Sequence, residues 1–322
     1  MRVVSTSSLP IDLSAQVRAQ LPDAIVDVPT SSEQWVGLAR YDLSDVDALV
    51  CLLLDRIDES VLARAPRLRV IAHCAVGYDN VDVAAATRAG IAVTNTPDVL
   101  TDATAEFTIA LMLAAARRLP EGDALVRSGQ WSGWRLDQLL GQPIKGRTLG
   151  IVGLGRIGLA VAERAVGLGM RVIYSEPHDV ATSFPAHRVE VDHLFAQADV
   201  VSLHCPLTPA TKHLVSAARL ARMKPTAILI NTARGGCVDD AALADALSAG
   251  TIFAAGLDVF NGEPQVNLRL LAAPRLVVAP HLGSATVDAR RAMAQLCADG
   301  VIAVLTGKRP ANLVNADVTV QR

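Results

Sequence analysis

The stretch TLGIVGLGRIG at residues 148–158 decides how this chain is expected to fold. It opens with a short apolar run, as in a buried strand, and the helical pattern LAVAERA follows it. Between the two, Gly153 would permit a tight turn, Gly155 the approach of a pyrophosphate, and Gly158 close packing of the helix. The free N–H groups and the positive dipole end of that helix would hold the anion. Because the chain has 22 glycines, an ordinary strand-to-helix turn is the alternative.

An acidic residue further along the chain supports a dinucleotide site. A second apolar run, residues 170–174, leads into Ser175 and Glu176, about 20 residues after the first glycine of the loop. A carboxylate at this point can accept hydrogen bonds from the ribose of an adenosine. The spacing therefore predicts a nucleotide-binding unit.

The composition sets limits on the class of protein. The 322 residues are 51% apolar and carry a formal net charge of -2, which indicates a globular chain long enough for two domains and no nucleic-acid partner. The longest apolar segments, such as residues 109–116, are shorter than the roughly 20 residues of a membrane helix. Residues 1–6 lack the apolar core of a signal peptide. We therefore expect no membrane partner.

The cysteines and histidines indicate neither disulfides nor a metal. The cysteines are odd in number and widely spread, with no CxxC pair: Cys51, Cys74, Cys205, Cys237 and Cys297. This pattern favours reduced thiols in a cytoplasm. The seven histidines show no metal-ligand spacing, so we expect no metal.

Short apolar runs alternate with helical patterns along most of the chain, which predicts an α/β protein with parallel sheets. Strands are expected at residues 3–4, 24–26, 48–54, 68–72, 91–94, 200–204, 227–230, 253–257 and 276–278, besides the two runs already described. Helices are expected near residues 12–20, 58–65, 82–89, 101–118, 191–197, 216–222, 239–249 and 284–305.

The loop HCAVGYDN at residues 73–80 follows a predicted strand. Ligands of open α/β sheets bind at the carboxyl ends of strands, so this loop is a candidate substrate cradle. The backbone N–H groups of Val76 and Gly77 could receive a carboxylate. A turn that contains glycine and binds nothing is the alternative.

The helix expected at residues 101–118 is apolar on most faces and contains no Gly or Pro. Such a helix must be buried on several sides, which favours packing between domains or between subunits. Trp131 and Trp134 follow in a loop that contains glycine. A pair of tryptophans in a loop more often forms an interface than performs chemistry.

Three polar residues that could carry chemistry each lie just beyond an apolar strand: Arg234, Glu263 and His281. Arg234 offers a planar set of donors for a carboxylate and a carbonyl oxygen. His281 could act as general acid, with Glu263 orienting its ring and favouring its protonated form. Taken singly, the three could instead be a surface ion-pair partner, a turn residue and a helix cap.

At this point the chain resembles the D-isomer-specific 2-hydroxyacid dehydrogenase family over about residues 45–315. The resemblance rests on ordered motifs at residues 76–80, 153–158, 204–208, 231–236, 262–264 and 280–284. Residues 95–106 and 126–131 are similar to the glyoxylate and hydroxypyruvate reductase branch. Six ordered motifs are far more specific than one glycine loop.

The resemblance implies two doubly wound parallel-sheet domains. A Rossmann dinucleotide-binding domain, residues 99–286, would be inserted into a flavodoxin-like substrate domain made of residues 1–98 and 287–322. It also implies a homodimer joined through the helix after residue 100. Whether Trp134 then reaches a neighbouring active site stays open.

The resemblance also implies roles for individual residues. Arg234 and His281 would bind substrate together with Val76 and Gly77, with His281 as the acid/base and Glu263 as its partner. Coenzyme contacts are implied for Thr104, Gly153, Leu154, Gly155, Arg156, Ile157, Gly158, Glu176, Cys205, Pro206, Thr211, Thr232, Ala233, Arg234, Asp258, His281 and Gly283.

The implied activity is hydride transfer between NAD(P)H and a small 2-oxo acid, giving a D-2-hydroxy acid, with glyoxylate and hydroxypyruvate as leading substrates. Glu176 favours NAD because it would repel a 2′-phosphate, although His178 or Arg188 could accept one. Formate dehydrogenases resemble this family too, but in that branch the active-site histidine is paired with Gln. The residue at that position here is Glu263, which disfavours a formate dehydrogenase. Phosphite dehydrogenase and an NAD-sensing interaction protein, like the corepressors that resemble this family, remain alternatives.

Overall fold

The computed structural model describes residues 1–319 except 31 and 34. The chain forms two compact units, one of Met1–Leu100 with Ala285–Arg322 and one of Thr101–Ser284. The sequence predicts borders between these units at 98/99 and 286/287. In the structure the borders follow Leu100 and Ser284, each close to the start of a long helix. These two helices are α4, Thr101–Ala116, and α11, Val287–Leu305.

The first unit contains a five-stranded parallel sheet with the strand order β2-β1-β3-β4-β5. This is the flavodoxin-like order, in which the strand order reverses between β1 and β3. The strands are β1 Arg2–Ser5, β2 Ile25–Asp27, β3 Ala48–Cys51, β4 Val70–His73 and β5 Ala92–Thr94.

Helices cover both faces of this sheet because successive side chains of a strand point to opposite faces. Val3 packs into a core with residues of α1 and α11, whereas Val4 packs into a core with residues of α2 and α3. The remaining helical elements of this unit are α1 Leu13–Gln20, α2 Glu59–Ala63, α3 Val83–Arg88 and the 3-10 helix η1 Leu38–Arg40.

The second unit contains a seven-stranded parallel sheet with the order β12-β11-β10-β9-β6-β7-β8. Counted from β6, this is the Rossmann order with one further strand, and it reverses between β6 and β9. The strands are β6 Thr148–Val152, β7 Arg171–Ser175, β8 Ala186–Arg188, β9 Val200–Leu203, β10 Ile228–Asn231, β11 Ala254–Leu257 and β12 Leu276–Val278.

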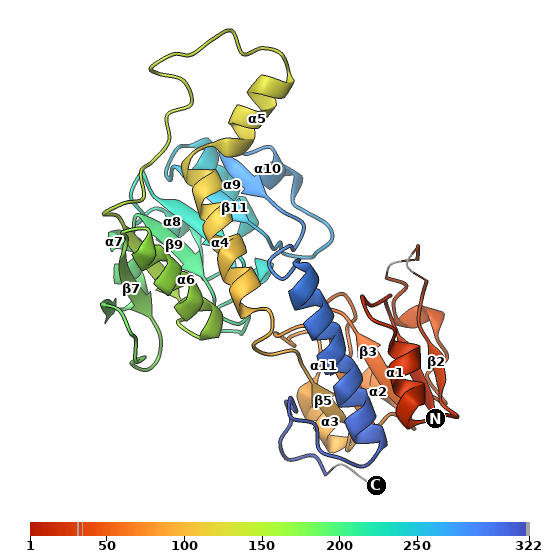
Figure 1. Cartoon of the computed structure of the whole chain (residues 1–322). Helices are drawn as coiled ribbons and strands as arrows, with labels where there is room; N and C mark the ends of the chain where they lie inside the picture. Colours follow the sequence, from red (N-terminus) through yellow and green to blue (C-terminus); the bar gives the residue numbers. More distant parts are fainter. Residues whose placement is uncertain (31, 34, 320–322) are drawn as a thin grey trace. The chain divides into compact units, whose positions relative to one another are not determined.

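Two cores hold this second sheet. Ile151 faces a core with residues of α4 and α6, which lie side by side (Figure 1), while Val152 faces a core with residues of α7 and α9. A Cβ at Gly150 would lie 2.7 Å from Leu194 Cδ2, so the glycine lets α7 approach the strand. The remaining helical elements are α5 Leu119–Arg127, α6 Arg156–Gly167, α7 Val191–Gln197, α8 Ala217–Leu220, η2 Gly235–Cys237, α9 Asp240–Ser248 and α10 Leu268–Leu271.

The structure confirms the predicted fold class and corrects some of its elements. The helix expected at 101–118 ends at Ala116, and α5 begins at Leu119 after Arg118, which has a positive φ of 54°. The expected strand at 48–54 ends at Cys51, where an irregular segment begins. The edge strand β8 has no counterpart among the predicted strands, because its sequence AHR is mostly polar and exposed and forms no apolar run.

Candidate active site

The glycine loop has the geometry of a phosphate-binding turn. Gly153 has a φ of 95°, and a Cβ there would lie 2.6 Å from the backbone nitrogen of Cys205. A Cβ at Gly158 would lie 2.2 Å from the carbonyl oxygen of Gly153. At Gly155 a Cβ would meet nothing within 4 Å, and this exposed residue directly precedes α6. The protein's own packing therefore explains two of the glycines, while the third leaves open space at the start of α6.

The segment after β9 lies directly against this loop. His204 donates its N–H to the carbonyl oxygen of Val152 at 2.8 Å, which places Cys205 beside Gly153. Burial lowers the pKa of His204 to about 4, and its Nε2 lies 2.8 Å from the hydroxyl of Ser202. This neutral histidine therefore supports the loop from within the protein.

Three candidates for coenzyme contact lie in this segment, and they differ in exposure and contacts: Cys205, Pro206 and Thr211. A hydrogen bond with the Cys237 thiol and burial raise the pKa of Cys205, which stays a protonated thiol. Pro206 is exposed, and Thr211 closes the turn by donating its hydroxyl to the Pro206 carbonyl oxygen at 2.6 Å.

Glu176 and Arg188 lie together at the end of β7. Arg188 donates to the carbonyl oxygens of Glu176 and Pro177 at 2.8 and 2.7 Å. Within the described residues, the Glu176 carboxylate makes no hydrogen bond or ion pair, so it is available to a ribose. Arg188, which the sequence offers as an alternative phosphate acceptor, already holds the loop that carries Glu176.

Glu263 and His281 form a hydrogen-bonded pair. His281 Nδ1 lies 2.8 Å from Glu263 Oε2, and Glu263 Oε1 accepts the N–H of Phe260 at 2.8 Å. The two side chains are 29% and 21% exposed. Because the carboxylate accepts at Nδ1, the ring's Nε2 is the nitrogen that can exchange a proton with a ligand.

Asp258 fixes the backbone next to this histidine. The carboxylate is 1% exposed and accepts the N–H groups of Leu282 and Gly283 at 2.6 and 2.7 Å. His281 itself donates its N–H to the Asp258 carbonyl oxygen and has a positive φ of 56°. Burial raises the pKa of Asp258 above its ordinary range. Asp258 is a candidate for coenzyme contact, and the structure gives it this supporting contact with the 281–283 loop.

Arg234 lies on the loop after β10, and Asn231 holds that loop. The Asn231 side chain accepts the N–H of Ala233 at 3.0 Å and donates to the Arg234 carbonyl oxygen at 2.9 Å. The guanidinium Nη1 donates to the Ala233 carbonyl oxygen at 2.7 Å. A Cβ at Gly235 would lie only 1.8 Å from the carbonyl carbon of Phe260. The loop of Arg234 is therefore pressed against the loop that leads to Glu263.

The first turns of α4 reach the same edge of the sheet. Thr108 donates to the Thr104 carbonyl oxygen at 2.7 Å, and its hydroxyl lies 2.8 Å from that of Thr232. A Cβ at Gly283 would lie 3.3 Å from Thr104 Cγ2. Thr104, Thr232 and Gly283 are thus neighbours. Sequence reasoning missed the supporting roles of Thr108 and Asn231, although an Asn at a strand end before a turn is a usable signal.

The candidate substrate residues Val76 and Gly77 belong to the first unit. They lie in the loop after β4, and both are half-buried.

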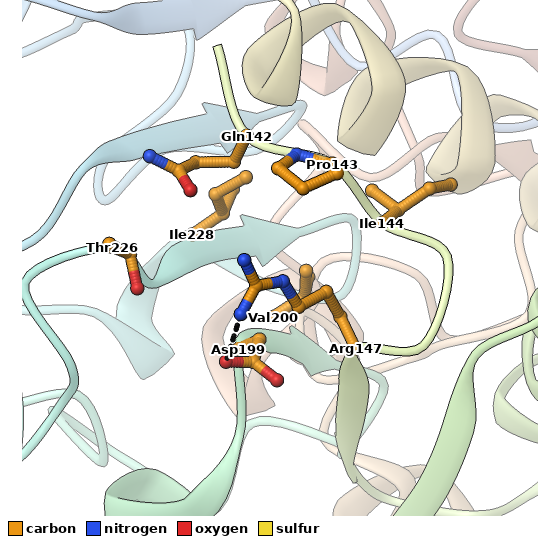
Figure 2. Close-up of a pocket in the computed structure, with 8 residues that line it drawn as sticks. All are labelled: Gln142, Pro143, Ile144, Arg147, Asp199, Val200, Thr226 and Ile228. Atoms are coloured by element: carbon orange, nitrogen blue, oxygen red, sulfur yellow. Dashed lines mark ion pairs between the residues drawn. The ribbon is translucent and has the colours of Figure 1, made fainter.

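A small pocket lies at the opposite, amino-terminal edge of the second sheet (Figure 2). Its volume of about 10 Å³ holds at most one water molecule. In its wall, the Asp199 carboxylate accepts a hydrogen bond from the N–H of Thr148 at 2.8 Å. It also forms ion pairs with Lys224 at 2.8 Å and with Arg147 at 4.0 Å. Burial would raise the pKa of Asp199, but its bonds to Lys224 and Thr148 hold it below the ordinary value. This cluster supports the sheet and takes no substrate.

The described residues form neither a metal-binding cluster nor a membrane-spanning helix. No group of three or more His, Cys, Asp or Glu in them could hold a metal ion. None of the helices formed by these residues is both long and apolar enough to cross a membrane.

Comparison with known proteins identifies the class. Residues 109–283 match the NAD binding domain of the D-isomer specific 2-hydroxyacid dehydrogenases. A glyoxylate reductase from Thermococcus litoralis is 50% identical over 289 residues, which are 88% of this chain and 87% of that protein.

Solved structures agree with this match. A Thermus thermophilus protein is 44% identical with a TM-score of 0.88, covering 98% of this chain and 100% of that one. An NADPH-dependent glyoxylate/hydroxypyruvate reductase from Sinorhizobium meliloti, in complex with NADP and malonate, is 32% identical with a TM-score of 0.84, covering 100% and 98%.

The chain belongs to the D-isomer specific 2-hydroxyacid dehydrogenase family. It is an NAD(P)-dependent oxidoreductase that acts on small 2-oxo and 2-hydroxy acids.

Proposed function

We propose that this enzyme reduces glyoxylate and hydroxypyruvate to glycolate and D-glycerate. One observation carries the proposal: His281 is bound to Glu263 at 2.8 Å, and the loop of Arg234 packs against the loop that leads to Glu263, at the carboxyl edge of the nucleotide-binding sheet. Two of the proteins named above are a glyoxylate reductase and a glyoxylate/hydroxypyruvate reductase, which supports these two substrates.

In the proposed mechanism Arg234 binds the substrate carboxylate and polarises the carbonyl oxygen. When bound, NAD(P)H supplies a hydride to the carbonyl carbon. His281 donates the proton from Nε2 to the developing alkoxide, and Glu263 stabilises the imidazolium before that transfer. One hydride and one proton are thereby added across the C=O bond, and the oxidation direction reverses both transfers.

The nucleotide would lie along the loop at residues 153–158. The open space at Gly155 and the helix that starts at Arg156 fit a pyrophosphate, with Leu154, Ile157 and Gly158 forming the rest of the turn. Glu176 would bind the ribose, which favours NAD over NADP. We propose that Thr104, Cys205, Pro206, Thr211, Thr232, Ala233, Asp258 and Gly283 line or support the remainder of the coenzyme site.

We propose that the N–H groups of Val76 and Gly77, in the domain formed by residues 1–98 and 287–322, complete the binding of the substrate carboxylate. Residues 99–286 would form the coenzyme domain.

We also propose a cytoplasmic homodimer joined through α4 and α5. Within the second unit, α5 and the loop after it extend away from the sheet (Figure 1). This arm exposes large apolar side chains, whose burial in a partner would be favourable. They are Leu119, Val126, Trp131, Trp134, Leu136 and Leu140. Light scattering of the purified protein tests the dimer, and a monomeric mass would contradict it.

The activity is tested with glyoxylate, hydroxypyruvate, pyruvate and phenylpyruvate, each with NADH and with NADPH. We expect the highest kcat/KM with glyoxylate or hydroxypyruvate, and a higher kcat/KM with NADH. Oxidation of phosphite without turnover of any 2-oxo acid would overturn the proposal in favour of a phosphite dehydrogenase. Coenzyme binding without turnover of any of these compounds would favour a sensing protein.

A further inference from the structure

In the loop at residues 75–78, three carbonyl groups are each bound by a residue outside the loop. Thr96 donates its N–H to the Ala75 carbonyl oxygen at 2.9 Å. Asn95 Nδ2 donates to the Val76 carbonyl oxygen at 2.8 Å, and His73 Nε2 lies 2.9 Å from the Gly77 carbonyl oxygen. Three successive peptide planes of this loop are therefore each bound through the carbonyl oxygen.

The N–H groups of the same peptide planes remain available. In a trans peptide the N–H points away from the C=O, so holding one direction fixes the other. Within the described part of the chain, the N–H groups of Val76, Gly77 and Tyr78 donate no hydrogen bond. Successive N–H groups without a partner in the protein can bind an anion.

His73 is fully buried at the end of β4, and its contacts determine the state of its ring. A carbonyl oxygen only accepts, so the proton lies on Nε2, towards Gly77. On the other side, Cys51 Sγ lies 3.5 Å from Nδ1, on the strand partner that pairs in register with His73. Burial raises the pKa of the Cys51 thiol well above its usual range, so the thiol keeps its proton and donates it to Nδ1.

We propose that His73, supported by Cys51, is a positioning residue for the substrate carboxylate. It fixes the peptide plane between Gly77 and Tyr78 and thereby adds the Tyr78 N–H to those of Val76 and Gly77 as a third donor. His73 does not touch the substrate. This inference rests on the proposed function, because it assigns the 2-oxo acid's carboxylate to this loop.

The test compares two variants of the histidine. His73→Leu removes the donor to Gly77, whereas His73→Gln can place an amide N–H near the position of Nε2. We expect His73→Leu to raise the KM for glyoxylate and the inhibition constant of oxalate about tenfold, with kcat and the KM for the coenzyme nearly unchanged. His73→Gln should restore both constants to within about threefold of the original enzyme.

A matched control separates positioning from general destabilisation. Val17→Ala removes buried apolar atoms from the helix α1 of the same unit. It should lower the melting temperature without changing the KM for glyoxylate. If His73→Leu does not fold, Cys51→Val provides the second test. It should raise both the KM for glyoxylate and the inhibition constant of oxalate.

The outcomes distinguish this inference from the proposed function. If the unmodified enzyme reduces no 2-oxo acid, the proposed function fails. If it does reduce glyoxylate but His73→Leu, or Cys51→Val in its place, leaves the KM unchanged, this inference alone is overturned. Equal losses in His73→Leu and His73→Gln would also overturn it, because the donor would then make no difference.

Discussion

The backbone at Gly235 lies so close to Phe260 that a methyl group on Gly235 would come within 1.8 Å of the Phe260 carbonyl carbon. No side chain can be accommodated there without moving one of the two loops, since the Phe260 atoms that it would meet belong to the backbone. One loop carries Arg234 and the other leads to Glu263. The spacing between these two catalytic candidates therefore depends on the absence of a side chain between them.

We predict that Gly235→Ala lowers kcat/KM by at least about a hundredfold, because a shift of about 1 Å misplaces both loops. Its free energy of unfolding should fall by about 1–3 kcal/mol. The matched control is Gly167→Ala at the end of α6, where a Cβ meets nothing within 4 Å. Steady-state kinetics and chemical denaturation check both variants, and near-normal kinetics for Gly235→Ala would contradict the packing argument.

Replacing the acid should mainly affect turnover. We expect His281→Ala to lower kcat by about a hundred- to ten-thousandfold, because no group then donates the proton. Glu263→Gln should cost less, because an amide can still accept from Nδ1 but does not stabilise the imidazolium. Fluorescence titration with NADH should show that both variants still bind the coenzyme. Retention of the original kcat by His281→Ala would remove the assignment.

Replacing Arg234 should affect both substrate affinity and turnover. Lysine keeps the charge but loses the planar pair of donors, so Arg234→Lys should raise the KM for glyoxylate and lower kcat. Substrate-concentration series at saturating coenzyme separate the two constants. A rise in KM with kcat unchanged would show that Arg234 binds the ground state and the transition state equally, contrary to the proposed polarisation of the carbonyl.

Glu176 should determine the choice of coenzyme. Glu176→Gln removes the negative charge that would face a 2′-phosphate, so the ratio of kcat/KM for NADPH to that for NADH should rise about tenfold. Glu163→Gln, an equal change of charge on an exposed part of α6, should leave the ratio as it was. A ratio that already favours NADPH in the unmodified enzyme would refute the role given to Glu176.

Asp199 should contribute stability that depends on pH. Because its pKa in the folded protein lies below the ordinary value of 3.8, its contribution is present above that value and is lost as the pH falls through the folded-state pKa. We expect Asp199→Asn to lower the free energy of unfolding by about 1–2 kcal/mol at pH 7, with the difference from the original protein vanishing in acid.

Urea denaturation across this pH range measures the Asp199 effect. Asp123→Asn breaks an exposed ion pair with Arg127 and should change stability by less than about 0.5 kcal/mol. A difference for Asp199→Asn that stayed constant down to the lowest pH would show that the carboxylate is not the source.

Residues adjacent to strongly periodic segments could be predicted from the chain alone. Arg234, Glu263 and His281 each follow an apolar strand, and parallel strands place their carboxyl ends at one edge of a sheet. The local contacts of Asn231 carry a usable signal, but the supporting contacts of Asp258 and Thr108 could not be predicted in this way. They depend on which loops pack against each other, and no local pattern encodes that packing.

By itself the sequence determined the alternation of strands and helices, the glycine loop and the family, because hydrophobic period and turn chemistry are local properties. Only the tertiary structure decided that Glu263 is bound to His281, that Gly235 is pressed against Phe260, and that His73 binds the Gly77 carbonyl oxygen. The first two pairs are distant in sequence, and the third depends on how the half-buried loop after β4 folds back onto its own strand. Such contacts follow from close packing of the whole chain, which no short segment specifies.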